Sequence, residues 1–191
     1  MNTTEPDALA QLREPDSRDG AFLHALIAAC PPLDENSVYC NLLQCTHFTG
    51  TSVVAEKAGR LVGAISGYRL PERPDTLFIW QVAVGADARG EGLASRMLAH
   101  IVERPANRDV THMETTITDD NGASWALFER FARDRQAPLE HRVLFDRDTH
   151  FAGQHASENL LRIGPFAGAA ARAHHSPEHS TPDMTARGHH A

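Results

Sequence analysis

The sequence predicts an α/β fold in which one mixed sheet carries helices on both faces. Two β-rich runs, residues 52–56 and 61–68, are joined by a short turn, which is typical of an antiparallel hairpin. The run 76–84 is almost continuously apolar, with β-branched and aromatic residues, the pattern of a strand buried on both faces. Helical and strand patterns then alternate, and this order places helices on both faces of the sheet.

Two helices are expected before the hairpin. Asp16 or Ser17 can cap the first helix, and Pro31 with Pro32 ends it. The second helix is expected near residues 36–46. The first helix has apolar residues at helical spacing, namely Phe22, Ala25, Leu26 and Ala29.

The alternating part begins with the central strand at 76–84. A helix is expected at 92–104, followed by a strand at 110–118, a helix at 121–133 and a strand at 139–145. The helix at 92–104 has one apolar face: Leu93, Met97, Leu98, Ile101 and Val102. The helix at 121–133 turns Trp125, Phe128, Phe131 and Ala132 inward.

Composition bounds the class of protein. A chain of 191 residues fits one domain, and such a domain buries roughly 70% of the surface that its unfolded chain exposes. The formal charge of -7, with both signs interspersed, gives no basic stripe for nucleic acid. No apolar run has the length of a membrane span, and the polar, acidic start does not resemble a secretory signal. The three cysteines have neither disulfide-framework nor zinc-ligand spacing, so we expect a cytoplasmic protein without a metal.

The two ends of the chain differ from the rest. Residues 1–12 are predicted to be a disordered N-terminal segment, and the folded domain is expected at 13–167. Residues 168–191 are small and polar without apolar periodicity, so they are predicted to be a disordered, histidine-rich tail. Histidine-rich tracts can bind metal, but these histidines lack fixed spacing, which favours a solvated tail. They are His174, His175, His179, His189 and His190.

The turn after the central strand contains the first candidate site. It contains Arg89, Gly90, Gly92, Leu93, Ala94 and Ser95. A strand that leads into a helix through small residues directs unpaired backbone N–H groups and the positive end of the helix dipole at one point, which suits a pyrophosphate. An ordinary solvated turn and a Rossmann dinucleotide site are the alternatives; Gly90 and Gly92 have the first spacing of the Rossmann fingerprint, but Ser95 replaces its third glycine.

The motif Arg89-x-x-Gly92-x-Ala94 after Val82-x-Val84 resembles motif A of the GCN5-related N-acetyltransferases, the GNAT superfamily. The resemblance implies a mixed, mostly antiparallel GNAT sheet, and acetyl-CoA whose pyrophosphate lies on the loop and whose pantetheine arm pairs with the backbone of Val82 and Val84. Asn121 and Ser124, with the helix that follows, resemble motif B and would lie along the cofactor, although helix capping is their purely structural role. Many relatives carry a tyrosine where this chain has Phe128, which cannot protonate the departing thiolate.

Other stretches resemble the L-2,4-diaminobutyrate acetyltransferases of ectoine synthesis. They are residues 33–48, 78–84, 114–121 and 153–165, and the resemblance spans roughly residues 13–166. It implies acetyl transfer to the γ-amino group of L-2,4-diaminobutyrate and a homodimer. A pocket for this substrate, which has two ammonium groups, needs acids, polar side chains and an aromatic wall.

Candidate substrate residues follow from that chemistry. Asp34 and Glu158 are expected at the ammonium groups, with Glu158 or His155 as the proton acceptor. Asn36, Tyr39 and Thr116 are expected to form hydrogen bonds, and Trp80 is expected to cover a cation. The structural alternatives are a helix cap for Asp34, an aromatic core position for Trp80, and a solvated face for Glu158 and His155. Cys45 and His47 do not face each other on a helix, so packing is expected for both.

Three other functions remain open at this point. A GNAT enzyme for another small amine shares every motif named here. A domain that binds acyl-CoA without turnover is compatible with Phe128. A Rossmann oxidoreductase would require a doubly wound parallel sheet.

Overall fold

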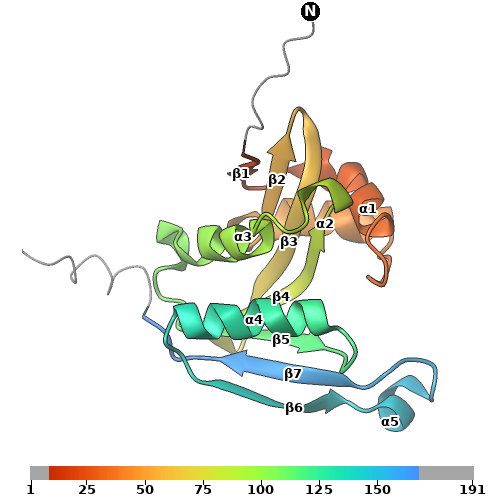
Figure 1. The fold of residues 1–191 in the computed structure, drawn as a ribbon, viewed down its shortest axis with the longest axis vertical. Coiled ribbons are helices and arrows are strands. Elements are labelled where there is room, and N and C mark those ends of the chain that lie inside the picture. Colours follow the sequence, from red (N-terminus) through yellow and green to blue (C-terminus); the bar gives the residue numbers. More distant parts are fainter. Residues whose placement is uncertain (1–8, 168–191) are drawn as a thin grey trace, which may run out of the picture.

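The computed structural model describes residues 9–167 and contains one seven-stranded sheet of order β1-β2-β3-β4-β5-β7-β6 (Figure 1). Neighbouring strands are antiparallel, except that β4 and β5 are parallel. The predicted mixed, mostly antiparallel sheet is therefore confirmed, and a doubly wound Rossmann sheet is excluded. The strands are β1 (Gln11–Arg13), β2 (Val53–Lys57), β3 (Arg60–Leu70), β4 (Arg73–Val84), β5 (His112–Ile117), β6 (Leu139–Phe145) and β7 (Glu158–Ile163).

Helices cover both faces of the sheet, as predicted. The side chains of α1 and α2 form one hydrophobic cluster with the sheet, and those of α3 and α4 form a second cluster with its other face (Figure 1). The helices are α1 (Gly20–Ala28), α2 (Val38–His47), α3 (Leu93–Val102), α4 (Gly122–Asp134) and α5 (Arg147–Phe151), and short 3₁₀ turns lie at Ser17–Asp19, Thr49–Thr51, Ala86–Ala88 and Pro105–Asn107.

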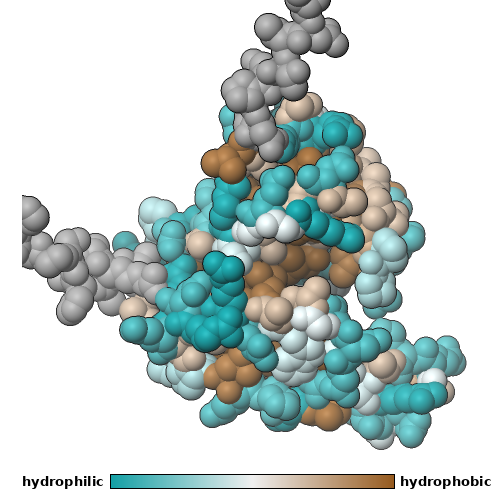
Figure 2. Space-filling view, viewed as in Figure 1, coloured by the Kyte–Doolittle hydropathy of each residue, from teal (hydrophilic) through white to brown (hydrophobic). Residues whose placement is uncertain are grey.

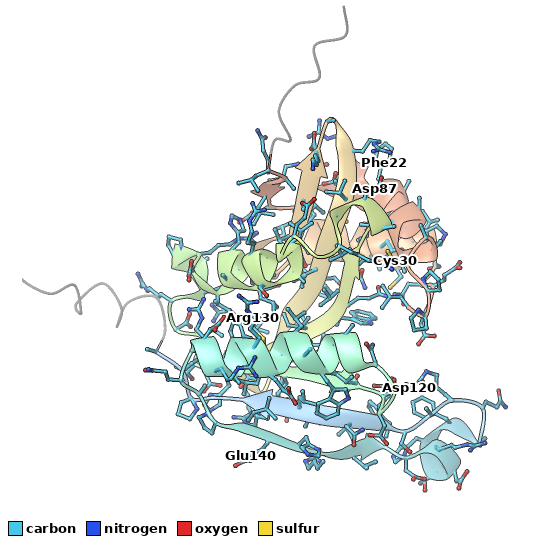
Figure 3. The ribbon with its side chains drawn as sticks, viewed as in Figure 1. Phe22, Cys30, Asp87, Asp120, Arg130 and Glu140 are labelled. Carbon is cyan, nitrogen blue, oxygen red and sulfur yellow. The ribbon has the colours of Figure 1, made fainter. Side chains whose placement is uncertain are left out.

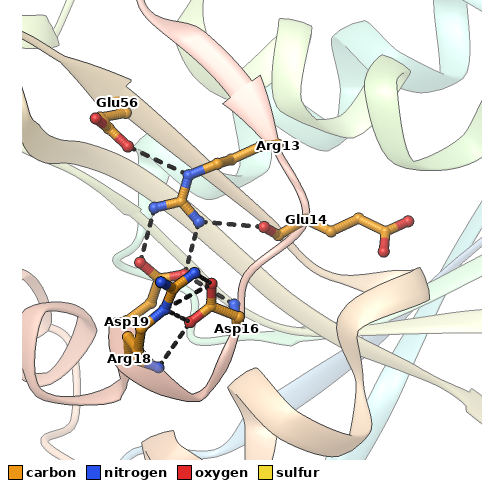
Figure 4. A network of polar contacts seen from close by, with 6 residues as sticks. All are labelled: Arg13, Glu14, Asp16, Arg18, Asp19 and Glu56. Atoms are coloured by element: carbon orange, nitrogen blue, oxygen red, sulfur yellow. Dashed lines mark hydrogen bonds and ion pairs between the residues drawn. The ribbon is translucent and has the colours of Figure 1, made fainter.

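The N-terminal part of the chain is ordered further than predicted. Ala10 is 4% exposed, and β1, which begins at Gln11, pairs with β2, although residues 1–12 were expected to be disordered. Arg13 explains the order, because its guanidinium donates to both oxygens of Asp19 at 2.7 and 2.8 Å and to Glu56 at 3.2 Å (Figure 4). The predicted disorder of the first eight residues and of 168–191 lies outside the described residues.

The helix α1 packs on a face that the sequence identified only at Leu26; the other three predicted residues, Phe22, Ala25 and Ala29, are exposed. Leu23, Leu26 and Ile27 are buried, whereas Phe22 is 65% exposed and borders the groove between α1 and the β2–β3 hairpin (Figure 3). Apolar residues occur around most of this helix, so their periodicity does not select one face. The apolar face predicted for α3 is fully buried, since its other face is polar.

The strand β4 contains a β-bulge at Trp80. In its pairing with β3, Gln81 lies opposite Ser66 and Ile79 lies opposite Gly67, so Trp80 has no partner. A bulge shifts the alternation of side chains, and Ile79 and Val82 consequently both pack in the cluster under α3 and α4. The prediction that this strand is buried on both faces is wrong at the bulge, where Trp80 is 44% exposed.

The sheet opens between its two parallel strands. β4 and β5 pair only through Thr76–His112, Leu77–Met113 and Phe78–Glu114. Beyond this point β4 continues along β3 and β5 continues along β7. The Thr115 hydroxyl donates to the Ile79 carbonyl at 3.0 Å and bridges the two strands where they separate.

Candidate functional site

A cavity of about 400 Å³ lies where β4 and β5 separate, and it is called the inter-strand cavity below. Its walls come from β4, β5, the start of α4, the α1–α2 loop (residues 29–37) and the α5–β7 loop (residues 152–157), with Glu158 at the start of β7. Hydrophobic side chains are visible in the depression between α3 and α4 (Figure 2). A larger groove of about 590 Å³ lies between α1 and the β2–β3 hairpin, but none of the predicted site residues lines it. The inter-strand cavity is therefore the candidate functional site.

Most of the predicted substrate residues meet in this cavity. Asp34, Asn36, Trp80, Thr116, His155 and Glu158 line it, together with Val82, Asn121 and Ser124 from the predicted cofactor set. Tyr39 does not line it, because its side chain is 68% exposed on α2. The remaining predicted cofactor residues lie outside its lining, at the end of β4 and the start of α3: Val84, Arg89, Gly90, Gly92, Leu93, Ala94 and Ser95.

Glu158 is half-buried at the start of β7. Its Oε2 atom has no hydrogen-bond partner among the described residues. Burial raises the pKa of its carboxyl group above the usual 4.5, while the hydroxyl of Thr116 and the ring of His155 oppose the rise. A carboxylate with an elevated pKa and an oxygen without a partner has the properties that a general base requires.

His155 and Asp34 face each other across the mouth of the cavity. His155 Nε2 lies 3.7 Å from Asp34 Oδ2, and His155 Nδ1 lies 2.8 Å from the carbonyl oxygen of Ala156. A carbonyl only accepts, so Nδ1 carries the hydrogen and Nε2 faces the carboxylate. Asp34 does not cap α2, because the hydroxyl of Ser37 accepts from the Cys40 amide. The carboxylate of Asp34 remains 85% exposed and can contact a cation.

Trp80 borders the cavity from the bulge in β4. Its ring lies 6.4 Å from the ring of Tyr68 in an edge-on arrangement. At 44% exposure it is not the core residue that the structural alternative required. Its exposed face is available to a cation, and the predicted cation contact stays a prediction.

Gln81 is a cavity residue that the sequence analysis missed. Its Nε2 atom donates to the Asp34 carbonyl at 2.8 Å, and its Oε1 atom accepts from Asn36 at 3.1 Å. The available signal was one amide side chain within the otherwise apolar run 77–84. No pattern in the sequence shows which loop such a residue contacts.

The N-terminus of α3 is open to an anion. Gly92 has φ +69° and caps the helix without a side-chain acceptor, and the first intrahelical bond runs from the Arg96 amide to the Gly92 carbonyl. The three preceding amides therefore have no partner within the helix, and the helix dipole adds positive potential. Arg89 donates its Nε to the Val84 carbonyl at 3.1 Å and is exposed beside this turn. This geometry suits an anionic group, and the predicted pyrophosphate contact stays a prediction.

The start of α4 forms another wall. The Asn121 side chain accepts from the Ser124 amide at 3.1 Å, so its structural role as a helix cap is confirmed, while both residues also line the cavity. Figure 3 shows Asp120 in the preceding loop. Phe128 contributes to the cavity floor at 2% exposure and carries no proton to donate.

Cys45 is a packing residue, as predicted. It is 1% exposed in the cluster beneath α1 and α2, and burial raises the pKa of its thiol to about 11. Such a thiol is a poor nucleophile at neutral pH. His47 is exposed, so the expectation that it is a packing residue is wrong.

Within residues 9–167, no helix combines the length and apolar character needed to cross a membrane. The same range contains no group of three or more His, Cys, Asp or Glu side chains arranged to hold a metal ion. The histidine-rich segment predicted as a solvated tail falls outside it.

Comparison with known sequences shows what this chain resembles. The model of the acetyltransferase (GNAT) family matches residues 19–132. The L-2,4-diaminobutyric acid acetyltransferase of Methylotuvimicrobium alcaliphilum is 56% identical over 155 residues, covering 81% of this chain and 90% of that protein. The protein of the same name from Chromohalobacter salexigens is 51% identical over 156 residues, covering 81% of each chain.

Solved structures agree with these matches. Diaminobutyrate acetyltransferase EctA from Paenibacillus lautus, in complex with its substrate L-2,4-diaminobutyric acid and coenzyme A, has a TM-score of 0.79 and 38% identity, covering 82% of this chain and 95% of that one. The ribosomal-protein-S18-alanine N-acetyltransferase of Escherichia coli has a TM-score of 0.63 at 12% identity, covering 91% and 99%, and shows the fold alone.

Proposed function

The chain belongs to the acetyltransferase (GNAT) family, and we propose that it transfers the acetyl group of acetyl-CoA to the γ-amino group of L-2,4-diaminobutyrate. The product, N-γ-acetyl-2,4-diaminobutyrate, belongs to the biosynthesis of ectoine, which protects cells against osmotic stress. One observation carries the proposal: Asp34 and Glu158, from opposite ends of the chain, face one cavity that opens beside the cofactor strand. A relative that is 56% identical carries this activity in its name.

Acetyl-CoA is proposed to lie along β4 and α3. The pyrophosphate accepts from the amides of Leu93, Ala94 and Ser95, beside the charge of Arg89. Gly90 and Gly92 permit close approach, because nothing lies within 4 Å of where a Cβ would be at either residue. The pantetheine arm follows the backbone of Val82 and Val84 into the opening between β4 and β5, with Asn121 and Ser124 alongside.

The amine substrate is proposed to bind between two carboxylates. Asp34 holds the α-ammonium group, and Trp80 covers this charge at a gain of about 0.5 to 2 kcal/mol. Asn36 donates a hydrogen bond to the rest of the molecule, while the hydroxyl of Thr116 donates to Glu158 and can accept one from the substrate. His155 Nε2 lies 3.7 Å from the Asp34 carboxylate on the opposite side, a weak contact that becomes an ion pair only when the ring is protonated. The proposed site does not include Tyr39, whose side chain lies outside the cavity.

Glu158 is proposed to remove the proton from the γ-ammonium group. An alkyl ammonium with a pKa near 10.4 must lose this proton before it attacks the thioester, which costs on the order of 4 kcal/mol at pH 7. The unpartnered Oε2 atom and raised pKa of Glu158 suit this step. A backbone N–H of the cofactor strand stabilises the oxyanion. Since Phe128 cannot supply a proton to the departing thiolate, water or another group must do so.

The test is an assay of the full chain with acetyl-CoA and L-2,4-diaminobutyrate. We expect steady release of coenzyme A thiol and, by NMR, acetylation at the γ-nitrogen. A panel of other amines, including lysine, a polyamine and a peptide N-terminus, shows whether one of them is a better acceptor than diaminobutyrate. Binding of acetyl-CoA without thiol release from any amine would instead indicate a sensor domain, and both outcomes contradict the proposal.

We also propose a cytoplasmic homodimer. Val38, Tyr39 and Leu43 expose apolar surface on the outer face of α2, which supports contact with a second copy. The three cysteines are free thiols, which fits a reducing compartment. Light scattering at a mass twice that of the monomer supports the dimer, and a monomer mass contradicts it.

A further inference from the structure

Gln81 joins the cofactor strand to the loop that carries the proposed α-ammonium site. On one side it donates to the backbone carbonyl of Asp34 at 2.8 Å, and on the other it accepts from the Asn36 side chain at 3.1 Å. Both atoms of its amide are therefore engaged, and both partners lie in the α1–α2 loop. The polar end of one side chain holds this loop at two points.

Because Gln81 lies in β4, these two hydrogen bonds set the position of the α1–α2 loop relative to the cofactor strand. It follows the bulged Trp80 and precedes Val82, which is proposed to pair with the pantetheine arm. A displacement of the loop relative to β4 thus changes the distance between Asp34 and the thioester. Asp34 has a second described contact, with His155 at 3.7 Å, but its side chain is 85% exposed, so this contact restrains it weakly.

We propose that Gln81 is a positioning residue that determines which amino group is acetylated. The inference rests on the proposed function. L-2,4-Diaminobutyrate carries an amine at each end of a short chain, and either amine can face the thioester. With Gln81 in place, Asp34 retains the α-ammonium group in its charged form, and the γ-amine reaches Glu158. Without it, Asp34 moves with its loop, and the reversed orientation becomes accessible.

Gln81→Met tests the inference, because methionine has similar length but makes neither hydrogen bond. Loss of two net hydrogen bonds should raise the KM for the amine by about tenfold. The KM for acetyl-CoA should change less than about twofold, since the α3 N-terminus is not affected. The N-α-acetyl isomer, resolved from the N-γ isomer by chromatography, should become a measurable fraction of the product. Gln81→Glu keeps a polar side chain but cannot donate to Asp34, and it should also yield the α isomer.

Asn107→Ala is the matched control. Asn107 is a buried amide that donates to the carbonyls of Gly50 at 2.9 Å and Ile101 at 2.8 Å, remote from the inter-strand cavity. It should lower the melting temperature while leaving the isomer ratio at the wild-type value. Wild-type isomer ratios from both folded Gln81 variants overturn the inference, as does an α isomer from Asn107→Ala. No turnover of diaminobutyrate by the wild type would overturn the proposed function itself, and the inference with it.

Discussion

Glu158 has an oxygen without a partner and a carboxyl group whose pKa burial raises. We predict that Glu158→Gln lowers kcat by a factor on the order of 10² to 10⁴, because the amide keeps the shape of the side chain but cannot accept the proton. Its Kd for acetyl-CoA by calorimetry should stay within about twofold, since the α3 N-terminus is intact. Asp120→Asn, in the same cavity but on an exposed loop, is the control and should retain most of the activity. Near-normal turnover of the Gln variant would remove Glu158 from the mechanism.

The same carboxyl group predicts a pH effect on stability. A raised pKa means that the folded state binds the proton more tightly than the unfolded state does. Its contribution to the free energy of unfolding is therefore favourable below the usual value of 4.5 and is lost as pH rises through the folded pKa. Urea denaturation of wild type and Glu158→Gln at pH 4 and pH 7 measures this contribution. The variant should gain stability relative to wild type at pH 7, and a constant difference would contradict the raised pKa.

At the scale of elements, substitutions in two turns distinguish the effect of backbone strain on stability from an effect on cofactor binding. One turn joins β4 to α3, and the other joins β2 to β3. Gly92 has φ +69° and Gly59, in the β2–β3 turn, has φ +72°, and nothing lies within 4 Å of a Cβ added at either. Alanine at each position should cost about 1 kcal/mol of stability, because both conformations are left-handed. Only Gly92→Ala should weaken coenzyme A binding, on the order of tenfold, since its strain acts on the amides that hold the pyrophosphate. Calorimetry measures the affinity of each variant for coenzyme A. Equal affinities would show that the turn between β4 and α3 is not part of the cofactor site.

Element length explains which parts of the fold the sequence predicted. The hairpin, the central strand and the long helices were predicted because their patterns extend over enough residues to show a period. β1 and α5 have three and five residues, too few for a periodicity, and β7 was not distinguished from a loop. The bulge at Trp80 is invisible in sequence, since it exists only in the register against β3.

At the scale of the whole molecule, the site depends on which segments the sheet brings together. The resemblance to known families supplied Asp34, His155 and Glu158, and the fold places all three at one cavity. Residue chemistry alone left a solvated face open for Glu158, because sequence does not show that β7 lies between β5 and β6. Tyr39 shows the opposite failure: its place in a matching segment did not bring its side chain into the cavity.

Glu114 holds β4, β5 and β7 together next to the point where β4 and β5 separate. This carboxylate is 3% exposed on β5 and accepts from Arg73 of β4 at 2.6 and 2.9 Å and from Arg162 of β7. It lies in the last paired position of β4 and β5, opposite Phe78. Burial alone would raise its pKa, but the two arginines lower it. Both strands that border the cavity are thus held together at the point from which they diverge.

Glu114→Gln should therefore reduce the free energy of unfolding by about 2 kcal/mol at pH 7, because charge-assisted bonds to two arginines are lost. With a lowered folded pKa, the contribution of the carboxylate is present above the usual 4.5 and is lost as pH falls through the folded pKa. The difference between wild type and variant in urea denaturation should accordingly shrink as the pH is lowered from 7 toward 3. Asp109→Asn, which removes a 64% exposed partner of Arg69, should cost less than about 1 kcal/mol. Equal losses from the two variants would show that Glu114 acts as an ordinary surface partner and that the sheet is held closed by other contacts.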